Sequence, residues 1–573
     1  MTDNLLSLLV VIPLATAVAS LVLIRRRLAQ RVLGLASLGS MLVLALGWLS
    51  EIRDGDVLVS QMGGWPAPYG ITLVFDSLSG LLLCAGLVVA LGCYVHSFSV
   101  IDPGMERRYF HPLIQLLIVG VNQCFLTGDL FNLFVGFEIM LMASYGLLVI
   151  GGSRRQMGQA YKYLVLNLIA STVFVISAGL VYGMFGTLNL ADLARIVEGR
   201  VASGEGLPTG FVGVSVLLLF AFGAKGAFFP LWFWLPDTYH TCPVPVAALF
   251  SGLLTKVGVY AVARTFPLIF AVGEARDVVV PLLLVSAAAT MLLGVLGAVS
   301  MNNVRRILAV HVVSQVGYMV FGLSLMTTAG LAGALYYMVQ HMIVKSSLFL
   351  CCGVMEQHAG SDDLGRIGGL QKRDRFLGVA FFVAAMSLVG LPPLSGFFGK
   401  LVLVREGWTD YWWLSVVALL TGALTLVSML KVWTKGFWLP PVASEPTPGS
   451  DGGAGSGDLR GAYVGIGFLV AVALFVGLAS FVLVLTLGGR DGWTTPLVLL
   501  LLLISAMSLV AFVYLQRTVS HPVLELGLLK HRVLSPVVIA SYLMFLSVFV
   551  NWFILPFYMS DALKVDAKTL GFL

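Results

Sequence analysis

Five ionisable side chains lie inside long apolar stretches of the sequence. They are Glu138, Lys225, Lys256, Lys345 and Lys400. A charge at the centre of a membrane-spanning helix costs roughly 2.5 to 3.5 kcal/mol, so such groups are expected to face the protein interior, water or one another. A buried Lys can lose its proton near neutral pH, and a buried Glu can hold one. Together these residue types favour a proton relay.

Two histidines extend the expected relay. His341 precedes Lys345 by four residues, so both side chains lie on one face of a helix. His311 belongs to the preceding apolar stretch. Since imidazole both accepts and donates a proton, we expect these residues to connect Lys256 with Lys400. Packing without a titration role is the alternative for either histidine.

Proline and glycine interrupt two of the charged stretches. Lys225 lies in FGAKGAFFPLWFWLPD (222–237), and Lys400 ends GLPPLSGFFGK (390–400). Broken helices at matching positions of two halves indicate the binding site of an inverted-repeat transporter, because they free backbone groups for ions and water. The alternatives are that a Lys extends to the membrane surface, or that Glu138 is only a structural partner of a Lys.

The composition excludes several classes of protein. Of 573 residues, 59% are hydrophobic and only 11% are charged, whereas soluble proteins carry about 25% charged residues. Six Cys without framework spacing exclude a disulfide scaffold. The basic residues form short clusters between apolar runs, so nucleic-acid binding is not implied. No motif for a metal, flavin, iron–sulfur centre or nucleotide stands in a suitable context, so we expect no cofactor and no enzymatic activity.

The elements that carry the charged residues are membrane-spanning helices of about 20 apolar residues each. Sixteen are predicted, near 5–24, 32–51, 73–97, 111–127, 129–150, 160–186, 211–236, 243–264, 278–300, 304–326, 328–357, 376–404, 411–437, 461–488, 494–516 and 536–560. The polar segment 439–460, rich in Pro, Gly and Ser, is predicted to be a flexible cytoplasmic loop.

The loops predict the orientation of the chain. Lys and Arg concentrate in alternate loops, beginning with Arg25–Arg27 after the first span, which puts these loops in the cytoplasm and both termini outside the cell membrane. No basic residue precedes the first span, so we expect it to be retained rather than cleaved as a signal peptide.

Several segments resemble one known family. They are DLFNLFVGFEIMLMASYGLL (129–148), FGAKGAFFPLWFWLPD (222–237), PVPVAALFSGLLTKVGVYAVAR (243–264), HMIVKSSLFL (341–350) and LPPLSGFFGK (391–400). They are similar to the antiporter-like membrane subunits shared by Mrp-type cation/proton antiporters, respiratory complex I and membrane-bound hydrogenases. DLFNLFVGFE together with SGFFGK is most similar to the D-type subunits of the Mrp group.

The resemblance implies an all-α integral membrane protein with a fourteen-helix antiporter-like fold, two inverted five-helix repeats and broken helices. About two further C-terminal helices would follow. The expected divisions are an N-terminal three-helix segment (1–110), the two repeats (111–264 and 278–437), the loop 439–460, a fourteenth span (461–488) and an appended segment (489–573).

The resemblance also implies roles for the charged residues. Glu138 would pair with Lys225, and Lys256 and Lys400 would continue the route across the membrane. His341 and Lys345 correspond to a His/Lys pair of the family.

The sequence therefore predicts the proton-translocating subunit of a multisubunit Na+/H+ antiporter. Its expected partners are other Mrp subunits, protons, sodium ions and lipid. A proton-pumping subunit of complex I or a hydrogenase, and a non-transporting scaffold subunit, are the alternatives.

The C-terminal segment departs from the family pattern. Residues 489–573 are similar to part of a major facilitator transporter, and their two expected spans contain no deep charge. We interpret this segment as an appended fragment without a transport path of its own; a hairpin that docks a neighbouring subunit is the alternative.

Overall fold

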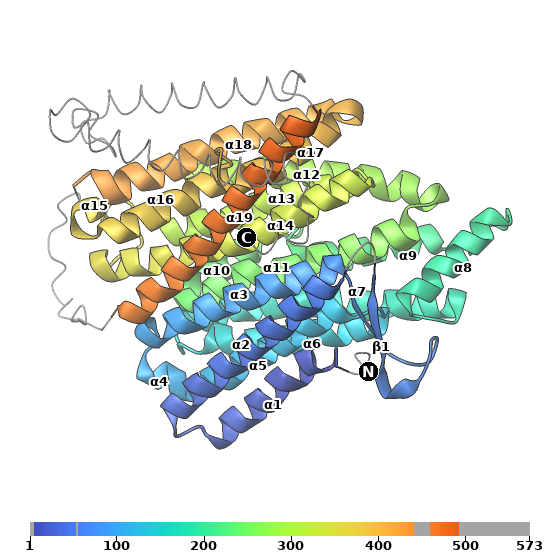
Figure 1. The fold of residues 1–573 in the computed structure, drawn as a ribbon, viewed down its shortest axis with the longest axis horizontal. Helices are drawn as coiled ribbons and strands as arrows, with labels where there is room; N and C mark the ends of the chain where they lie inside the picture. Colours follow the sequence, from blue (N-terminus) through green and yellow to red (C-terminus); the bar gives the residue numbers. More distant parts are fainter. Residues whose placement is uncertain (1–4, 53–55, 441–458, 492–573) are drawn as a thin grey trace, which may run out of the picture. The chain divides into compact units, whose positions relative to one another are not determined.

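The computed structural model describes residues 5–52, 56–440 and 459–491, and these form a helical protein with one short β-hairpin (Figure 1). The long helices are α1 (Leu8–Val22), α2 (Arg27–Glu51), α3 (Ser77–Val100), α5 (His111–Leu126), α6 (Leu130–Val149), α7 (Arg154–Phe185), α8 (Leu190–Ala202), α9 (Phe211–Gly226), α11 (Val244–Thr265), α12 (Gly273–Ser300), α13 (Val304–Ser324), α14 (Thr328–Ala359), α16 (Arg375–Val389), α17 (Ser395–Asp410), α18 (Trp412–Trp433) and α19 (Arg460–Asp491). Shorter elements are β1 (Leu58–Gln61), β2 (Thr72–Phe75), α4 (Pro103–Met105), α10 (Leu235–Thr241), α15 (Leu370–Arg373) and the tight or wide turns η1 (Met62–Gly64), η2 (Glu106–Phe110), η3 (Phe266–Phe270) and η4 (Thr434–Trp438).

Fourteen membrane crossings are present in the described residues. Eleven helices are long and apolar enough to span a bilayer, and three shorter apolar helices, α1, α9 and α16, complete the set. The chain is therefore a multi-pass membrane protein, and its crossings fall where the first fourteen were predicted. The two spans predicted near 494–516 and 536–560, and most of the loop 439–460, lie outside the described residues.

Two compact units divide the chain, Met1–Thr486 and Leu487–Leu573, and all the residues predicted to act lie in the first. Within it, α5, α6, α7, α9/α10 and α11 form one series of five crossings, and α12, α13, α14, α16/α17 and α18 form a second. Because five is odd, the second series starts from the opposite membrane face. The two series are thus inverted with respect to each other.

Both predicted helix breaks are present. α9 ends at Gly226, Ala227 takes a left-handed φ of 60°, and the chain resumes as a helix only in α10. α16 ends at Val389, Gly390 takes a φ of 91°, and α17 starts at Ser395. The prolines in both gaps have no amide N–H to continue the helical hydrogen bonds, so the breaks follow from the sequence.

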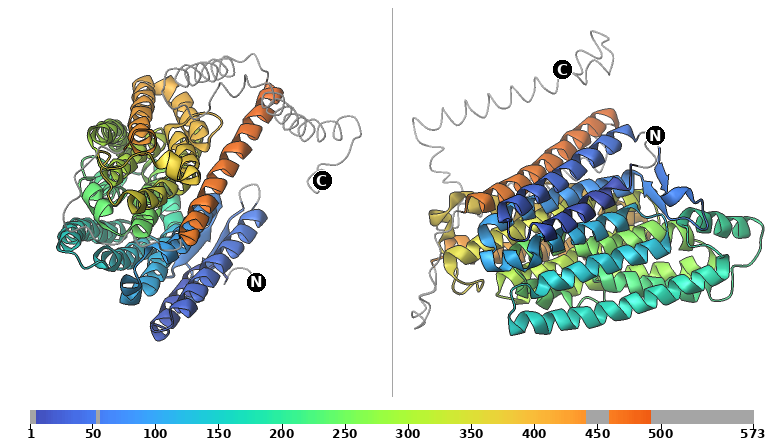
Figure 2. Two further views of the ribbon diagram at one scale, coloured as in Figure 1. Left: turned by 90° about the vertical axis from the view of Figure 1, so that its left-hand side faces the viewer. Right: turned by 90° about the horizontal axis from the view of Figure 1, so that it is seen from below.

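Burial is concentrated at the centre of the first unit. The membrane-spanning windows of α11, α13 and α14 are 94% or more buried, whereas α2, α7, α12 and α18 keep an exposed apolar face. Figure 2 shows from two further sides that the helices of the first unit run roughly parallel to one another. The charged residues of α11, α13 and α14 consequently sit farthest from lipid.

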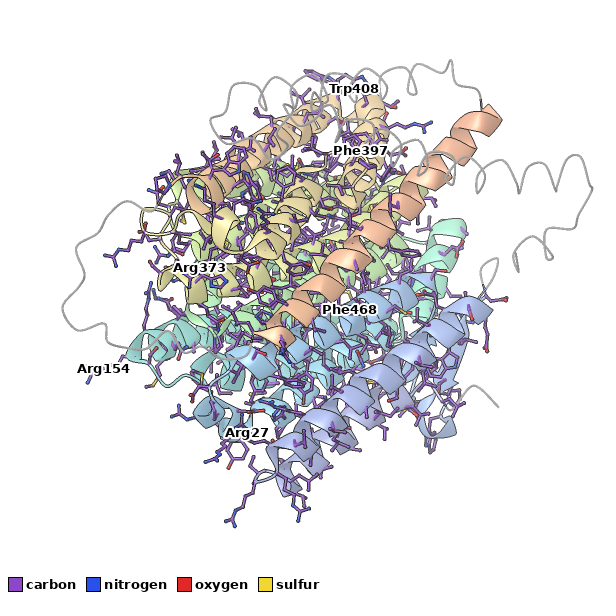
Figure 3. All side chains as sticks on the ribbon, turned by 60° about the vertical axis from the view of Figure 1, so that its left-hand side comes forward. Arg27, Arg154, Arg373, Phe397, Trp408 and Phe468 are labelled. Atoms are coloured by element: carbon purple, nitrogen blue, oxygen red, sulfur yellow. The ribbon has the colours of Figure 1, made fainter. Side chains whose placement is uncertain are left out.

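Arginines from three distant loops lie toward one end of the bundle, which is called the basic end below. Figure 3 shows Arg27, Arg154 and Arg373 toward one end and Trp408 toward the other. The first three belong to the basic loops predicted to share one side of the membrane. Their common position agrees with the alternating path of the chain.

Candidate functional site

Glu138 and Lys225 are joined through a third residue. Ser171, on α7, donates a hydrogen bond to Glu138 Oε1 and accepts one from Lys225 Nζ at 2.9 Å. The direct distance between Lys225 Nζ and Glu138 Oε1 is 3.9 Å. Since α6, α7 and α9 each supply one member, small movements of these helices change the strength of the ion pair.

The two charged members differ in their surroundings. Lys225 is buried, and its ammonium lies 4.9 Å from the centre of the Phe137 ring, where it gains a cation–π contact. The Glu138 side chain is 28% exposed, so the carboxylate is not enclosed by this chain alone. The Lys225 ammonium is thus stabilised inside the protein by the Glu138 carboxylate, whereas part of the Glu138 side chain lies on the surface of this chain.

Lys256 occupies the centre of α11 and is fully buried. Its ammonium donates to the backbone oxygen of Ser251 and to Thr255 Oγ1, the latter at 3.2 Å. Both partners are neutral. Lys256 is therefore held by dipoles and not by a carboxylate.

His341 and Lys345 lie beside Lys256. All three groups are close enough to interact electrostatically, because α11 packs against α14. Both ring nitrogens of His341 and the ammonium of Lys345 are fully buried and have no hydrogen-bond partner among the described residues. Buried polar groups normally have a hydrogen-bond partner, so these three atoms set the centre of the molecule apart from an ordinary apolar core.

A hydrogen-bonded chain runs from His311 toward α14. His311 Nε2 lies 2.9 Å from Ser428 Oγ, and its Nδ1 lies 3.4 Å from Ser314 Oγ. Gln315 donates to Ser314 Oγ at 2.8 Å and accepts from the hydroxyl of Tyr337. His311 is thus linked to α18 and, through two side chains, to α14.

Lys400 is placed at the break of the second repeat. Its ammonium donates to the backbone oxygens of Leu388 at 3.0 Å and Val389 at 2.9 Å, the last residues of α16. The rings of Tyr318 and Tyr337 lie 4.6 Å and 5.9 Å from the ammonium. Lys400 therefore points inward and does not extend to the membrane surface.

The predicted residues form two groups in the structure. Glu138 and Lys225 make the first, and the second contains Lys256, His341, Lys345, His311 and Lys400. Sequence reasoning missed Ser171, Ser251, Tyr337 and Ser428, which contact the charged residues. Hydroxyl groups are common in membrane helices, so nothing in the sequence distinguished these four.

No group of three or more His, Cys, Asp or Glu that could hold a metal is found in the part of the chain that the structure describes. The six cysteines are all free and buried.

The sequence matches the profile of the family described as NADH:quinone oxidoreductase/Mrp antiporter, transmembrane region, over residues 127–425. This interval contains α6 through most of α18 and exceeds half of the chain. The chain belongs to this family of membrane proteins.

Two relatives with established names indicate which branch of the family this chain resembles. The chain is 42% identical over 438 residues to the D subunit of the Na+/H+ antiporter of Alkalihalophilus pseudofirmus, covering 76% of this chain and 87% of the relative. It is 37% identical over 438 residues, with the same coverage, to the D subunit of the Na+/H+ antiporter of Bacillus subtilis. These names favour an antiporter subunit over a subunit of a redox complex.

Solved structures share the fold. A chain of the Mrp complex from Dietzia sp. superposes with a TM-score of 0.74 at 32% identity, covering 84% of this chain and 96% of that one. A chain of the archaeal membrane-bound sulfane sulfur reductase also gives 0.74, at 25% identity, over 83% and 94% of the two chains. A chain of respiratory complex I from Thermus thermophilus, at 23% identity, has the same fold with a TM-score of 0.64. The fourteen-helix antiporter-like architecture is thereby confirmed.

Proposed function

We propose that this chain is the proton-translocating D-type component of a multisubunit Na+/H+ antiporter, and that it carries protons along the Glu138–Lys400 axis in exchange for cytoplasmic sodium. The observation that carries the proposal is the group formed by Lys256, His341 and Lys345, where three polar atoms are fully buried without a protein partner among the described residues. Proton donors and acceptors in contact with internal water are the components of a relay.

Transfer begins at the ion pair. Glu138 stabilises the ammonium of Lys225, and Ser171 bridges them. When the helices separate the pair, Lys225 loses this stabilisation and its proton moves toward Lys256. Because Lys256 and Lys345 interact electrostatically, a change of charge on one favours transfer at the other.

The second half completes the route. From Lys256 and Lys345 the proton passes through water and His341 toward Lys400, with His311 alongside. Lys400 then exchanges its proton with the opposite membrane face. The chain lies in the cell membrane with its basic end in the cytoplasm and both termini outside, and it acts as part of a transporter and not as an enzyme.

The chain acts within an assembly of several different subunits. The relatives are named as subunits, and the partly exposed Glu138 supports a neighbouring subunit at this face of α6 and α7. The partners are other Mrp subunits, and sodium crosses elsewhere in the complex.

The test is Lys256→Met in the reconstituted complex, measured as sodium-driven proton movement. Methionine keeps the length and loses the charge, so we expect assembly at normal yield and loss of transport. Lys162→Met is the matched control, because Lys162 lies on the membrane helix α7 but is exposed. Glu138→Gln should also abolish transport. Full transport by an assembled Lys256→Met complex would overturn the proposal, and it would favour the scaffold alternative.

A further inference from the structure

Two prolines leave the last backbone oxygens of α16 without their helical donors. In an α-helix, the oxygen of one residue accepts from the amide four residues later. For Leu388 and Val389 these residues are Pro392 and Pro393, which have no N–H. The Lys400 ammonium donates to both oxygens instead, at 3.0 Å and 2.9 Å. The lysine therefore completes the end of this helix.

The oxygen that precedes these two is also released from the helix. The N–H of Leu391, four residues after Ser387, lies 3.2 Å from Met386 O instead, because Gly390 takes a left-handed φ of 91°. Gln340 of α14 supplies the missing donor: its Nε2 lies 3.4 Å from Ser387 O and 3.3 Å from Ser387 Oγ. Three successive oxygens of this turn thus receive their hydrogen bonds from side chains.

The orientation of the Gln340 amide follows from its partner. A backbone oxygen can only accept, so the amide nitrogen must face Ser387 O. The amide oxygen, Oε1, is buried and has no hydrogen-bond partner among the described residues. A hydrocarbon side chain of similar size would fill this space without leaving a buried acceptor unpaired, so packing alone does not explain an amide here.

The break of the first repeat is built in the same way. Ala224 O, next to Lys225, has lost its helical donor, because the N–H of Phe228 bonds the preceding oxygen, that of Gly223, at 2.9 Å. Trp234 Nε1 donates to Ala224 O instead, at 3.1 Å. Both breaks thus place a side-chain N–H on the equivalent oxygen of the helix end, although the two donors come from different parts of the fold.

The Lys400 ammonium has few other groups to stabilise it. The rings of Tyr318 on α13 and Tyr337 on α14 face it at 4.6 Å and 5.9 Å, and His311 and His341 interact with it electrostatically. From α16 it receives the two backbone oxygens, and no ion pair of Lys400 is found in the part of the chain that the structure describes. The direction of these two oxygens therefore decides how well the charge is held.

We propose that Gln340 is a positioning residue for Lys400: it anchors the last turn of α16 to α14, so that the oxygens of Leu388 and Val389 stay directed at the ammonium. When Lys400 gives its proton to water at the opposite face, the anchor keeps the turn in place, and Lys400 takes up the next proton from the relay at the same position. This inference rests on the proposed function, because it names what sets the affinity of the last group of that relay for a proton.

The test is Gln340→Met in the intact complex, with transport measured while the pH on the face opposite the basic end is varied. Methionine keeps the approximate shape and removes the donor. We expect half-maximal transport to need a proton concentration about two- to tenfold higher, the range that one hydrogen bond contributes. Gln340→Asn keeps the amide but is one methylene shorter, so it should give the same shift, and it serves if methionine prevents assembly. A residue that only packs would change the yield or the maximal rate and leave this concentration unchanged.

Two further variants are controls. Gln357→Met makes the same change at an exposed position of α14, so its half-maximal proton concentration should match wild type. Trp234→Phe keeps an aromatic ring and removes the equivalent donor beside Lys225. It separates the loss of a hydrogen bond at any helix end from the loss of one beside Lys400, so this concentration should again match wild type. An equal shift in Trp234→Phe and Gln340→Met would overturn the proposal.

A second measurement does not depend on transport. In a double-mutant cycle on the melting temperature of the complex, the decreases caused by Gln340→Met and Lys400→Met should not add, because both act on one turn. Additive decreases, or a wild-type proton concentration at half-maximal transport in an assembled Gln340→Met complex, would overturn the positioning role while leaving the relay intact. Transport by Lys256→Met would overturn the relay instead.

Discussion

Ser171 shows how a single hydroxyl group can control a charged pair. It contacts both Glu138 and Lys225, which are 3.9 Å apart and would otherwise interact only across that gap. The five charges could be predicted from the sequence because each is costly in an apolar helix. Ser171 could not, because a serine in a membrane helix satisfies itself on its own backbone at little cost.

Ser171→Ala should weaken transport without removing either charge. Hydrogen bonds to charged groups contribute about 1.5–3 kcal/mol, so we expect a fall in rate of roughly tenfold or more. Ser177→Ala is the control on the same helix, since the hydrogen bond of Ser177 among the described residues is to the backbone oxygen of Val173, at 2.7 Å. Equal rates for the two variants, in sodium-driven proton uptake, would show that the bridge is dispensable.

Asp362 should make the complex sensitive to acid. Burial raises the pKa of Asp362, but hydrogen bonds from His240 and Asn303 outweigh burial and lower it from the ordinary value of 3.8 to about 2. Its stabilising contribution is therefore present above about pH 4 and is lost as the pH falls toward 2. Asp362→Asn should lower the melting temperature at neutral pH and reduce its decline below pH 4. Asp363→Asn should change the acid response less, because the Asp363 side chain accepts one hydrogen bond among the described residues, from the Gly365 amide at 2.6 Å.

At the scale of the helices, the two breaks were predictable from the sequence. The interaction of Lys400 with the carbonyl groups that one break exposes was not. Proline and glycine near Lys225 and Lys400 predicted both interruptions, and the structure contains them. The sequence suggested that Lys400 lies late in its span. In the structure its ammonium turns back to the carbonyl oxygens of Leu388 and Val389, because the break leaves them without helical partners.

The contact between α9 and α11 depends on one glycine. A Cβ atom added to Gly258 would lie 2.3 Å from the backbone nitrogen of Gly226 and 2.8 Å from the carbonyl carbon of Lys225. Gly258→Ala should therefore push the helices apart, destabilise the fold by roughly 1–3 kcal/mol and displace Lys225. Gly179→Ala, where an added Cβ meets nothing within 4 Å, should leave the melting temperature of the complex unchanged or raised. Identical melting temperatures for both variants would contradict the close contact.

At the scale of the whole molecule, the fourteen crossings of the described residues were predictable because hydrophobic length and alternating loop charge are strong signals. The division of the relay into two groups was not, since it depends on which helices touch. The cavity of about 760 Å³ between the ends of α3, α7, α10, α13 and α14 was not predictable either, because five separate chain segments line it.

The C-terminal segment should be dispensable for transport. All relay residues and the family match at 127–425 precede it. We expect a chain that ends at Asp491 to assemble and to transport at the wild-type rate. A chain that ends at Pro440 should fail to assemble, because it loses α19, whose Ala462 backbone oxygen contacts His96 and whose Ser480 contacts Tyr336. Loss of transport in the longer truncation, measured in the reconstituted complex, would assign this segment a role.

Two half-helices, α9 and α16, stop inside the membrane. The lysines at their ends, Lys225 and Lys400, differ in the groups that stabilise them. Each half-helix ends in carbonyl groups equivalent to roughly half a negative charge, and both Lys225, in the last turn of α9, and Lys400 lie at such an end. Lys225 has a partly exposed acidic partner in addition, whereas no ion pair of Lys400 is found among the described residues. The stabilisation of the Lys225 ammonium therefore changes whenever the Glu138 side chain moves. The stabilisation of the Lys400 ammonium is constant, because backbone carbonyl groups provide it.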